Sequence, residues 1–99
     1  MKCHRADRGI ELQLTIEGAL DALTVHEVRP TFDQVVADRP RRVAIDLNSL
    51  TMLDSSGVGA IVSLFKRVKA QGGQVVILRA QDQPLAVLKL LKLDRVFGL

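Results

Sequence analysis

The sequence predicts an α/β domain with a mixed, mostly parallel β-sheet joined by βα crossover units in the order β-β-α-β-α-β-α. An N-terminal run alternates apolar and polar residues, and two later runs have the composition of short buried strands. Three stretches with helical periodicity follow or separate these runs, an order typical of parallel sheets with right-handed crossovers. The chain has 99 residues, so we expect a single domain, 1–99, with one core.

The first two strands are predicted to form a hairpin. Residues 10–16 alternate apolar and polar side chains, the period-2 pattern of a half-buried strand. Arg8 and Gly9 are expected to turn the chain back from a shorter strand that precedes them. The alternating pattern breaks at Gly18, where the second strand is predicted to end.

A first helix is predicted from Thr24, which forms a capping-box pattern with Glu27 three residues later. One face of this helix is apolar: Val25, Val28, Phe32, Val35 and Val36. Pro30 falls inside it. A proline in a helix interior costs about 3 kcal/mol or more, so we expect a kink or a later start. The segment 37–42 is predicted to end the helix.

Residues 42–47 and 74–79 are predicted to be buried strands, because both are short and rich in β-branched and apolar side chains. Between them lies a strongly amphipathic helix that Gly72 and Gly73 close. Its predicted apolar face comprises Val58, Ile61, Val62, Phe65 and Val68.

The last predicted helix begins with Asp82 as its cap and Pro84 in its first turn. Its predicted inward-facing residues are Leu85, Val87, Leu88 and Leu91. A final strand is expected only to begin after it.

Composition and charge argue against two classes of partner. The net charge is +3, but the basic residues are scattered apart from a cluster at 39–42, and the chain has no Trp or Tyr to stack bases. We therefore expect no direct nucleic-acid binding. No apolar run approaches a membrane span, and no apolar segment follows the basic N-terminus as in a secretory signal, so the expected localisation is cytoplasmic.

The most informative segment is 48–68, "NSLTMLDSSGVGAIVSLFKRV", where a strand exit meets a helix start. In open α/β sheets, functional loops gather beyond the carboxyl ends of the strands. The loops at 18–21, 54–57 and 79–82 are expected to meet there. Four residues of the central loop require an explanation: Asp54, Ser55, Ser56 and Gly57.

Catalysis and cofactor binding are poorly supported at this loop. A serine nucleophile needs a base, and the two histidines, His4 and His26, lie far from it in the sequence; the G-x-S-x-G elbow is also absent. Val62 stands where the third glycine of a dinucleotide fingerprint belongs. The adjacent pair Cys3 and His4 has no normal metal-ligand spacing. We therefore predict no catalytic residue, no metal and no cofactor.

Two interpretations of the loop remain open. Asp and Ser are good N-cap residues, so the loop could simply begin a helix. Capping needs one side-chain oxygen, however, whereas three polar side chains precede this helix. A serine at an exposed helix start is also accessible to a kinase, and the free N–H groups there stabilise a phosphate.

Four segments resemble, in order and spacing, the STAS-domain anti-sigma factor antagonists of bacterial partner-switching systems: "GALDALT" (18–24), "VAIDLNSLTMLDSSGVGAIV" (43–62), "GGQVVIL" (72–78) and "LLKLDRVF" (90–97). The resemblance spans nearly the whole chain, and "LDSSGVG" after "IDL" is its specific part. It implies a STAS-like fold with a shortened C-terminal strand and helix, because many members continue beyond the point that corresponds to Leu99. Val96 and Phe97 would then pack differently or be covered by a partner.

The resemblance also implies a mechanism. The unmodified protein would bind an anti-sigma factor that is also a GHKL-type serine kinase, and so free a sigma factor or an equivalent regulator. Phosphorylation of Ser55 would end binding, and a PP2C-type phosphatase would restore it. Asp21, Asp54, Ser56 and Gly57 would shape the partner-binding surface. Ala19 departs from the family, which often has Glu there.

Two other functions remain alternatives to a phosphorylation-controlled antagonist. The chain could be a STAS docking subunit of a transport or sensory complex, without a phosphorylation cycle. A serine hydrolase that uses Ser55 is disfavoured by the missing catalytic partners. The sequence leaves the oligomeric state open.

Overall fold

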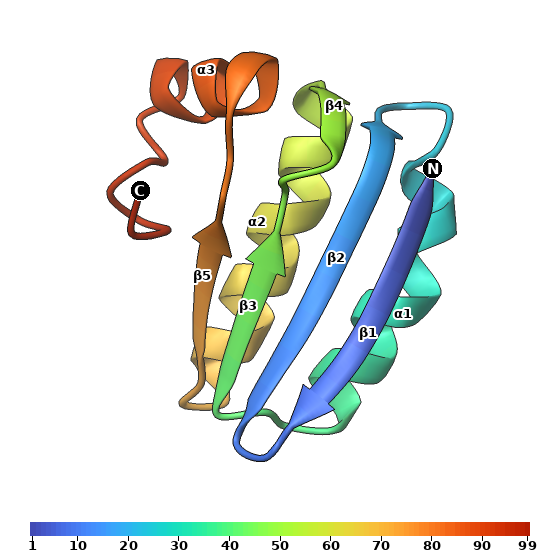
Figure 1. Ribbon diagram of the computed structural model, residues 1–99. Coiled ribbons are helices and arrows are strands. Elements are labelled where there is room, and N and C mark those ends of the chain that lie inside the picture. Colours follow the sequence, from blue (N-terminus) through green and yellow to red (C-terminus); the bar gives the residue numbers. More distant parts are fainter.

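The computed structural model describes all residues, 1–99, as a five-stranded sheet with three helices (Figure 1). The strands are β1 (Lys2–Arg8), β2 (Glu11–Leu20), β3 (Arg42–Asp46), β4 (Leu50–Leu53) and β5 (Gln74–Leu78). The helices are α1 (Val25–Ala37), α2 (Ser55–Ala70) and α3 (Asp82–Leu90). The strand order is β1-β2-β3-β5, and β4 pairs separately with β2. The α/β fold class predicted from the sequence is confirmed.

The sheet is parallel except at β1, which forms the predicted antiparallel hairpin with β2. Two details of the prediction are wrong. Strand β2 does not end at Gly18 but continues to Leu20, because β4 pairs with this extension after a bulge between Gly18 and Ala19. Strand β4 itself was not predicted, so the observed order is β-β-α-β-β-α-β-α.

The helices cover the sheet unequally. Helices α1 and α2 lie on one face, whereas α3 lies at the end of the sheet where β3 and β5 terminate (Figure 1). Leu12, Leu14 and Ile16 alternate along β2 with half-buried polar residues and belong to the main hydrophobic core. The core therefore lies between the sheet and the α1–α2 layer.

Helix α1 begins at Val25 and runs through Pro30, which excludes the later start, one of the two expected effects of this proline. Helix α2 ends as predicted: Gly72 has a φ of 84°, and the Gly73 N–H donates to the Val68 carbonyl at 3.0 Å. The buried face of α2 includes Leu64, which the predicted apolar face omitted.

The C-terminal segment differs more from its prediction. The N-cap of α3 is Gln81 rather than Asp82. Leu88 is fully buried, but Leu91 is 48% exposed because the helix ends at Leu90. The chain after α3 forms turns instead of a strand, and Phe97 is buried with its ring 5.4 Å from that of Phe65. None of the helices has the length and apolar composition that crossing a membrane requires.

Candidate functional site

Asp54 joins two loops at the carboxyl ends of the strands. It is the N-cap of α2, where its Oδ1 accepts a hydrogen bond from the Gly57 N–H at 3.0 Å. Its Oδ2 accepts a second bond, from the Ala22 N–H in the β2–α1 loop, also at 3.0 Å. The bond from Gly57, helped by the one from Ala22, lowers the pKa of Asp54 despite partial desolvation. Asp54 therefore stays ionised and fixes both loops at once.

Ser55 and Ser56 begin helix α2 but have different surroundings. Ser55 is the first residue of the helix and is exposed. Ser56 is half-buried and lines a groove between α1 and α2. Of the two hydroxyls, that of Ser55 is therefore the more accessible to an enzyme acting from outside.

Gly57 is required by the close packing of α2 on the strands. A Cβ added at Gly57 would lie 2.5 Å from the Leu20 carbonyl oxygen and 2.7 Å from Cδ1 of Leu53. Gly57 is also buried, so it can contribute to a partner surface only indirectly, by setting the position of the helix start. Its suggested role in partner binding stays a prediction.

Asp21 caps the turn that leads into α1. Its Oδ1 accepts hydrogen bonds from the Leu23 N–H at 2.9 Å and the Thr24 N–H at 3.1 Å. Thr24 reciprocates, since its Oγ1 accepts from the Asp21 N–H at 3.0 Å. This reciprocal pair replaces the predicted capping box, because Thr24 makes no side-chain cap bond to α1. Asp21 is thus a half-buried turn former as well as an acidic residue of the loop.

Two polar contacts that the sequence analysis missed support these loops. The Gln83 side chain accepts from the Leu53 N–H at 2.8 Å and donates to the Leu53 carbonyl at 2.9 Å, which ties α3 to the residue before Asp54. The sequence carries no local signal for this contact, because the partners are 30 residues apart. This contact therefore connects α3 to the end of β4, directly before the start of α2.

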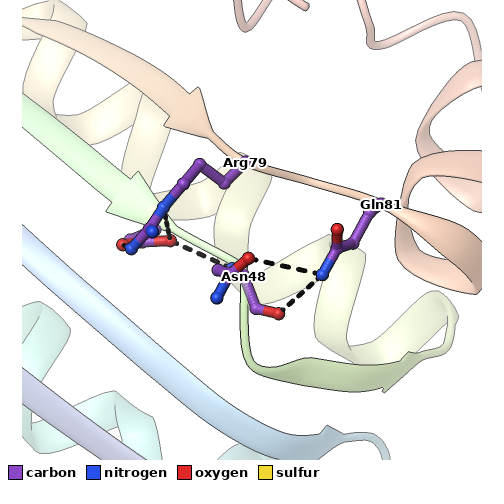
Figure 2. Close-up of polar contacts among 4 residues, drawn as sticks. Asn48, Arg79 and Gln81 are labelled. Carbon is purple, nitrogen blue, oxygen red and sulfur yellow. Dashed lines mark hydrogen bonds and ion pairs between the residues drawn. The ribbon is translucent and has the colours of Figure 1, made fainter.

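The second missed contact is a polar cluster at the ends of β3 and β5, where Figure 2 shows Arg79, Asn48 and Gln81 converging. Its anchor is Asp46, which is only 2% exposed and accepts from the Arg79 guanidinium and the Asn48 N–H. Burial alone would raise the pKa of Asp46, but the bonds from Arg79 and Asn48 outweigh it and leave the pKa lowered. Gln81 donates to the Asn48 carbonyl at 3.0 Å.

The arrangement offers little for acid–base catalysis at Ser55. His4 pairs through Nε2 with Glu17 Oε2 at 2.7 Å, on the β1–β2 hairpin. His26 is exposed on the second residue of α1, and neither histidine bonds to Ser55. No three His, Cys, Asp or Glu side chains gather where they could hold a metal ion. Ser55 is thus an exposed hydroxyl without a histidine bonded to it.

Comparison with known proteins identifies the class to which this fold and loop arrangement belong. The model of the STAS domain matches residues 4–99, and the chain belongs to the STAS domain family. A STAS-domain containing protein of Pseudomonas aeruginosa is 27% identical over 89 residues, 90% of this chain and 87% of that protein. An anti-sigma F factor antagonist of Paenibacillus polymyxa is 31% identical over 71 residues, 71% of this chain and 60% of that protein.

Solved structures agree on the fold. An anti-sigma factor antagonist from Mycobacterium paratuberculosis has a TM-score of 0.85 at 23% identity, covering 97% of this chain and 81% of that one. The Bacillus cell fate determinant SpoIIAA in its phosphorylated form has a TM-score of 0.76 at 18% identity, covering 95% of this chain and 86% of that one. The resemblance stated from the sequence is confirmed, and the protein is a STAS domain similar to anti-sigma factor antagonists.

Proposed function

We propose that the chain is a phosphorylation-controlled antagonist of an anti-sigma factor. In its unmodified form it binds an anti-sigma factor that is also a GHKL-type serine kinase, and this binding releases a sigma factor or an equivalent regulator. The kinase transfers the γ-phosphoryl group of ATP to the Ser55 hydroxyl, and the complex dissociates. A PP2C-type phosphatase hydrolyses the phosphoserine and restores the binding form. Asp21, Asp54 and Ser56 belong to the surface that the kinase contacts.

The observation that carries the proposal is the exposed Ser55 hydroxyl at the first position of α2. A phosphate at this position lies near the N–H groups of the first helical turn and the positive end of the helix dipole, which offset its charge. Asp54 beside it opposes the phosphate. We therefore expect the fold to tolerate the modification at a modest cost in stability.

Phosphorylation is expected to change the affinity for the partner more than the stability of the fold. A phosphoserine adds about −1.5 to −2 charges at pH 7, directly after Asp54, whose carboxylate bonds the loop that carries Asp21. Like charges placed across an interface cost several kcal/mol, and each ~1.4 kcal/mol is tenfold in affinity. Phosphorylation of Ser55 is therefore expected to weaken binding by about a hundredfold or more.

The test is phosphorylation by each purified GHKL-type anti-sigma kinase of the source organism, with ATP, followed by peptide mapping. One phosphate is expected, on Ser55. Ser55→Ala should abolish labelling, while Ser56→Ala, the matched control at the neighbouring hydroxyl, should be labelled. Stoichiometric labelling of Ser55→Ala would show that the site is assigned to the wrong residue.

A further inference from the structure

A groove between α1 and α2 begins beside the proposed phosphorylation site. Its volume is about 350 Å³, and Ser56, at the start of α2, forms part of its wall. Phe32 and Leu64 contribute buried apolar side chains, whereas Gly59, Ala60 and Ser63 supply small residues along α2. The groove therefore has an apolar floor and a low wall on the α2 side.

The packing of the fold does not require a glycine at position 59. A Cβ added at this position would meet no atom within 4 Å, and the residue is exposed in the interior of a regular helix. Glycine at such a position is less favourable than alanine by about 1 kcal/mol. Gly57, two residues earlier, is different because the strands leave no room for a Cβ there. The open space above Gly59 is thus available to a surface from outside the molecule.

The charges around the groove define the chemistry of that surface. Arg29 and Arg67 line it together with one acidic residue, Asp33. Arg67 donates to Asp33 Oδ1 at 2.8 Å, so this pair is internally neutralised. Arg29 is exposed and takes part in none of the ion pairs of the structure. The groove therefore presents one uncompensated positive charge next to an apolar floor.

We propose that the groove is the docking site for an amphipathic helix of the partner kinase, with an acidic residue placed opposite Arg29. This inference rests on the function proposed above and names the element that binds. Two packed helices form a groove that a third helix fills side by side, and small residues permit the short interaxial distances of about 8–10 Å that helix packing requires. An acidic side chain opposite Arg29 adds a charge-assisted contact.

The same geometry explains how the switch acts on binding. Ser55 adjoins Ser56, which lines the groove, so a phosphate on Ser55 lies at one end of it. The phosphate thus places a negative charge at this end of the groove, and this charge repels the acidic helix. The groove and the phosphorylated loop form one continuous surface.

The test measures the affinity of the purified GHKL-type anti-sigma kinase for Gly59→Gln, since glutamine favours the helix while its side chain projects over the groove. Binding should weaken at least tenfold, and the melting temperature should not fall. Ala70→Gln is the matched control: it adds the same side chain at an exposed position of α2 outside the groove and should bind as the unmodified chain does.

A charge test addresses the acidic helix. Arg29→Glu should weaken kinase binding at least tenfold, and Arg29→Lys should retain most of the affinity. Equal affinity for Gly59→Gln and the unmodified chain would overturn the groove inference while leaving the proposed function intact. If no purified kinase binds the unmodified chain, the proposed function itself fails, and the groove inference fails with it.

Discussion

The two glycines at the start of α2 give opposite predictions for the same substitution. In Gly57→Ala the new Cβ would lie 2.5 Å from a backbone oxygen of β2, the Leu20 carbonyl, and 2.7 Å from the Leu53 side chain. The side chain can rotate, but the backbone of a central strand cannot move without disturbing its pairing with β4. In Gly59→Ala the new Cβ meets nothing within 4 Å.

The magnitudes follow from these distances. Overpacking of this kind costs roughly 1–3 kcal/mol, which for a domain of this size lowers the melting temperature by about 4–8 °C per kcal/mol. We therefore expect Gly57→Ala to melt roughly 5–20 °C below the unmodified chain. Gly59→Ala gains up to about 1 kcal/mol of helix propensity and should melt up to about 4–8 °C above it.

Thermal and urea unfolding of the two variants, followed by far-UV circular dichroism, measures both effects in the same helix. An unchanged midpoint for Gly57→Ala would mean that the start of α2 is not pressed against β2 and β4. A lower midpoint for Gly59→Ala would mean that the space above Gly59 is occupied within the fold. Either result would refute the distinction between a packing glycine and a glycine that leaves room for a partner.

Three further predictions concern carboxylates. Asp21→Ala should lower the melting temperature by several degrees in a thermal scan, because it removes the acceptor of two loop N–H groups; an unchanged value would leave Asp21 a solvated loop acid. Asp54→Asn should have a midpoint between those of the unmodified chain and Asp54→Ala, because only one amide oxygen replaces two accepting oxygens; equality with Asp54→Ala would contradict this. The lowered pKa of Asp46 makes a stabilising contribution that is present above the unfolded pKa of about 3.9 and is lost as pH falls through the folded value. Arg79→Met should reduce the change in the free energy of unfolding between about pH 5 and 2, as measured by urea unfolding. An unaltered pH dependence would show that Arg79 does not stabilise the Asp46 carboxylate.

Local patterns predicted most of the fold because its main elements obey simple periodicities. The alternation from Leu12 to Ile16 in β2 and most of the helical spacing in α2 are found in the structure, since each element buries one side against the same core. Strand β4 escaped prediction because it has only four residues, with Thr51 and Met52 between two buried leucines. Such a short strand is stabilised by pairing with β2 rather than by its own pattern.

The sequence predicted the residues of the candidate site but not the hydrogen bonds that join their loops. Asp54 was one of the candidate N-cap residues and does cap α2, but its bond to the Ala22 N–H joins residues 32 positions apart. The sequence predicted a capping box of Thr24 with Glu27, whereas the structure pairs Asp21 with Thr24. The Asp21–Thr24 pairing could not be predicted locally, because it depends on the path of the chain leaving β2, where Thr24 Oγ1 also donates to the Ala19 carbonyl at 2.8 Å.

The central claim is that a phosphate on Ser55 acts on the partner and not on the scaffold. Its most direct test is titration calorimetry of the purified anti-sigma kinase with the unmodified chain and with the chain phosphorylated at Ser55, together with the melting temperature of each form. We predict about a hundredfold or greater loss of affinity, with a melting temperature that changes by only a few degrees. Equal affinity of the two forms, or unfolding of the phosphorylated one, would contradict the claim.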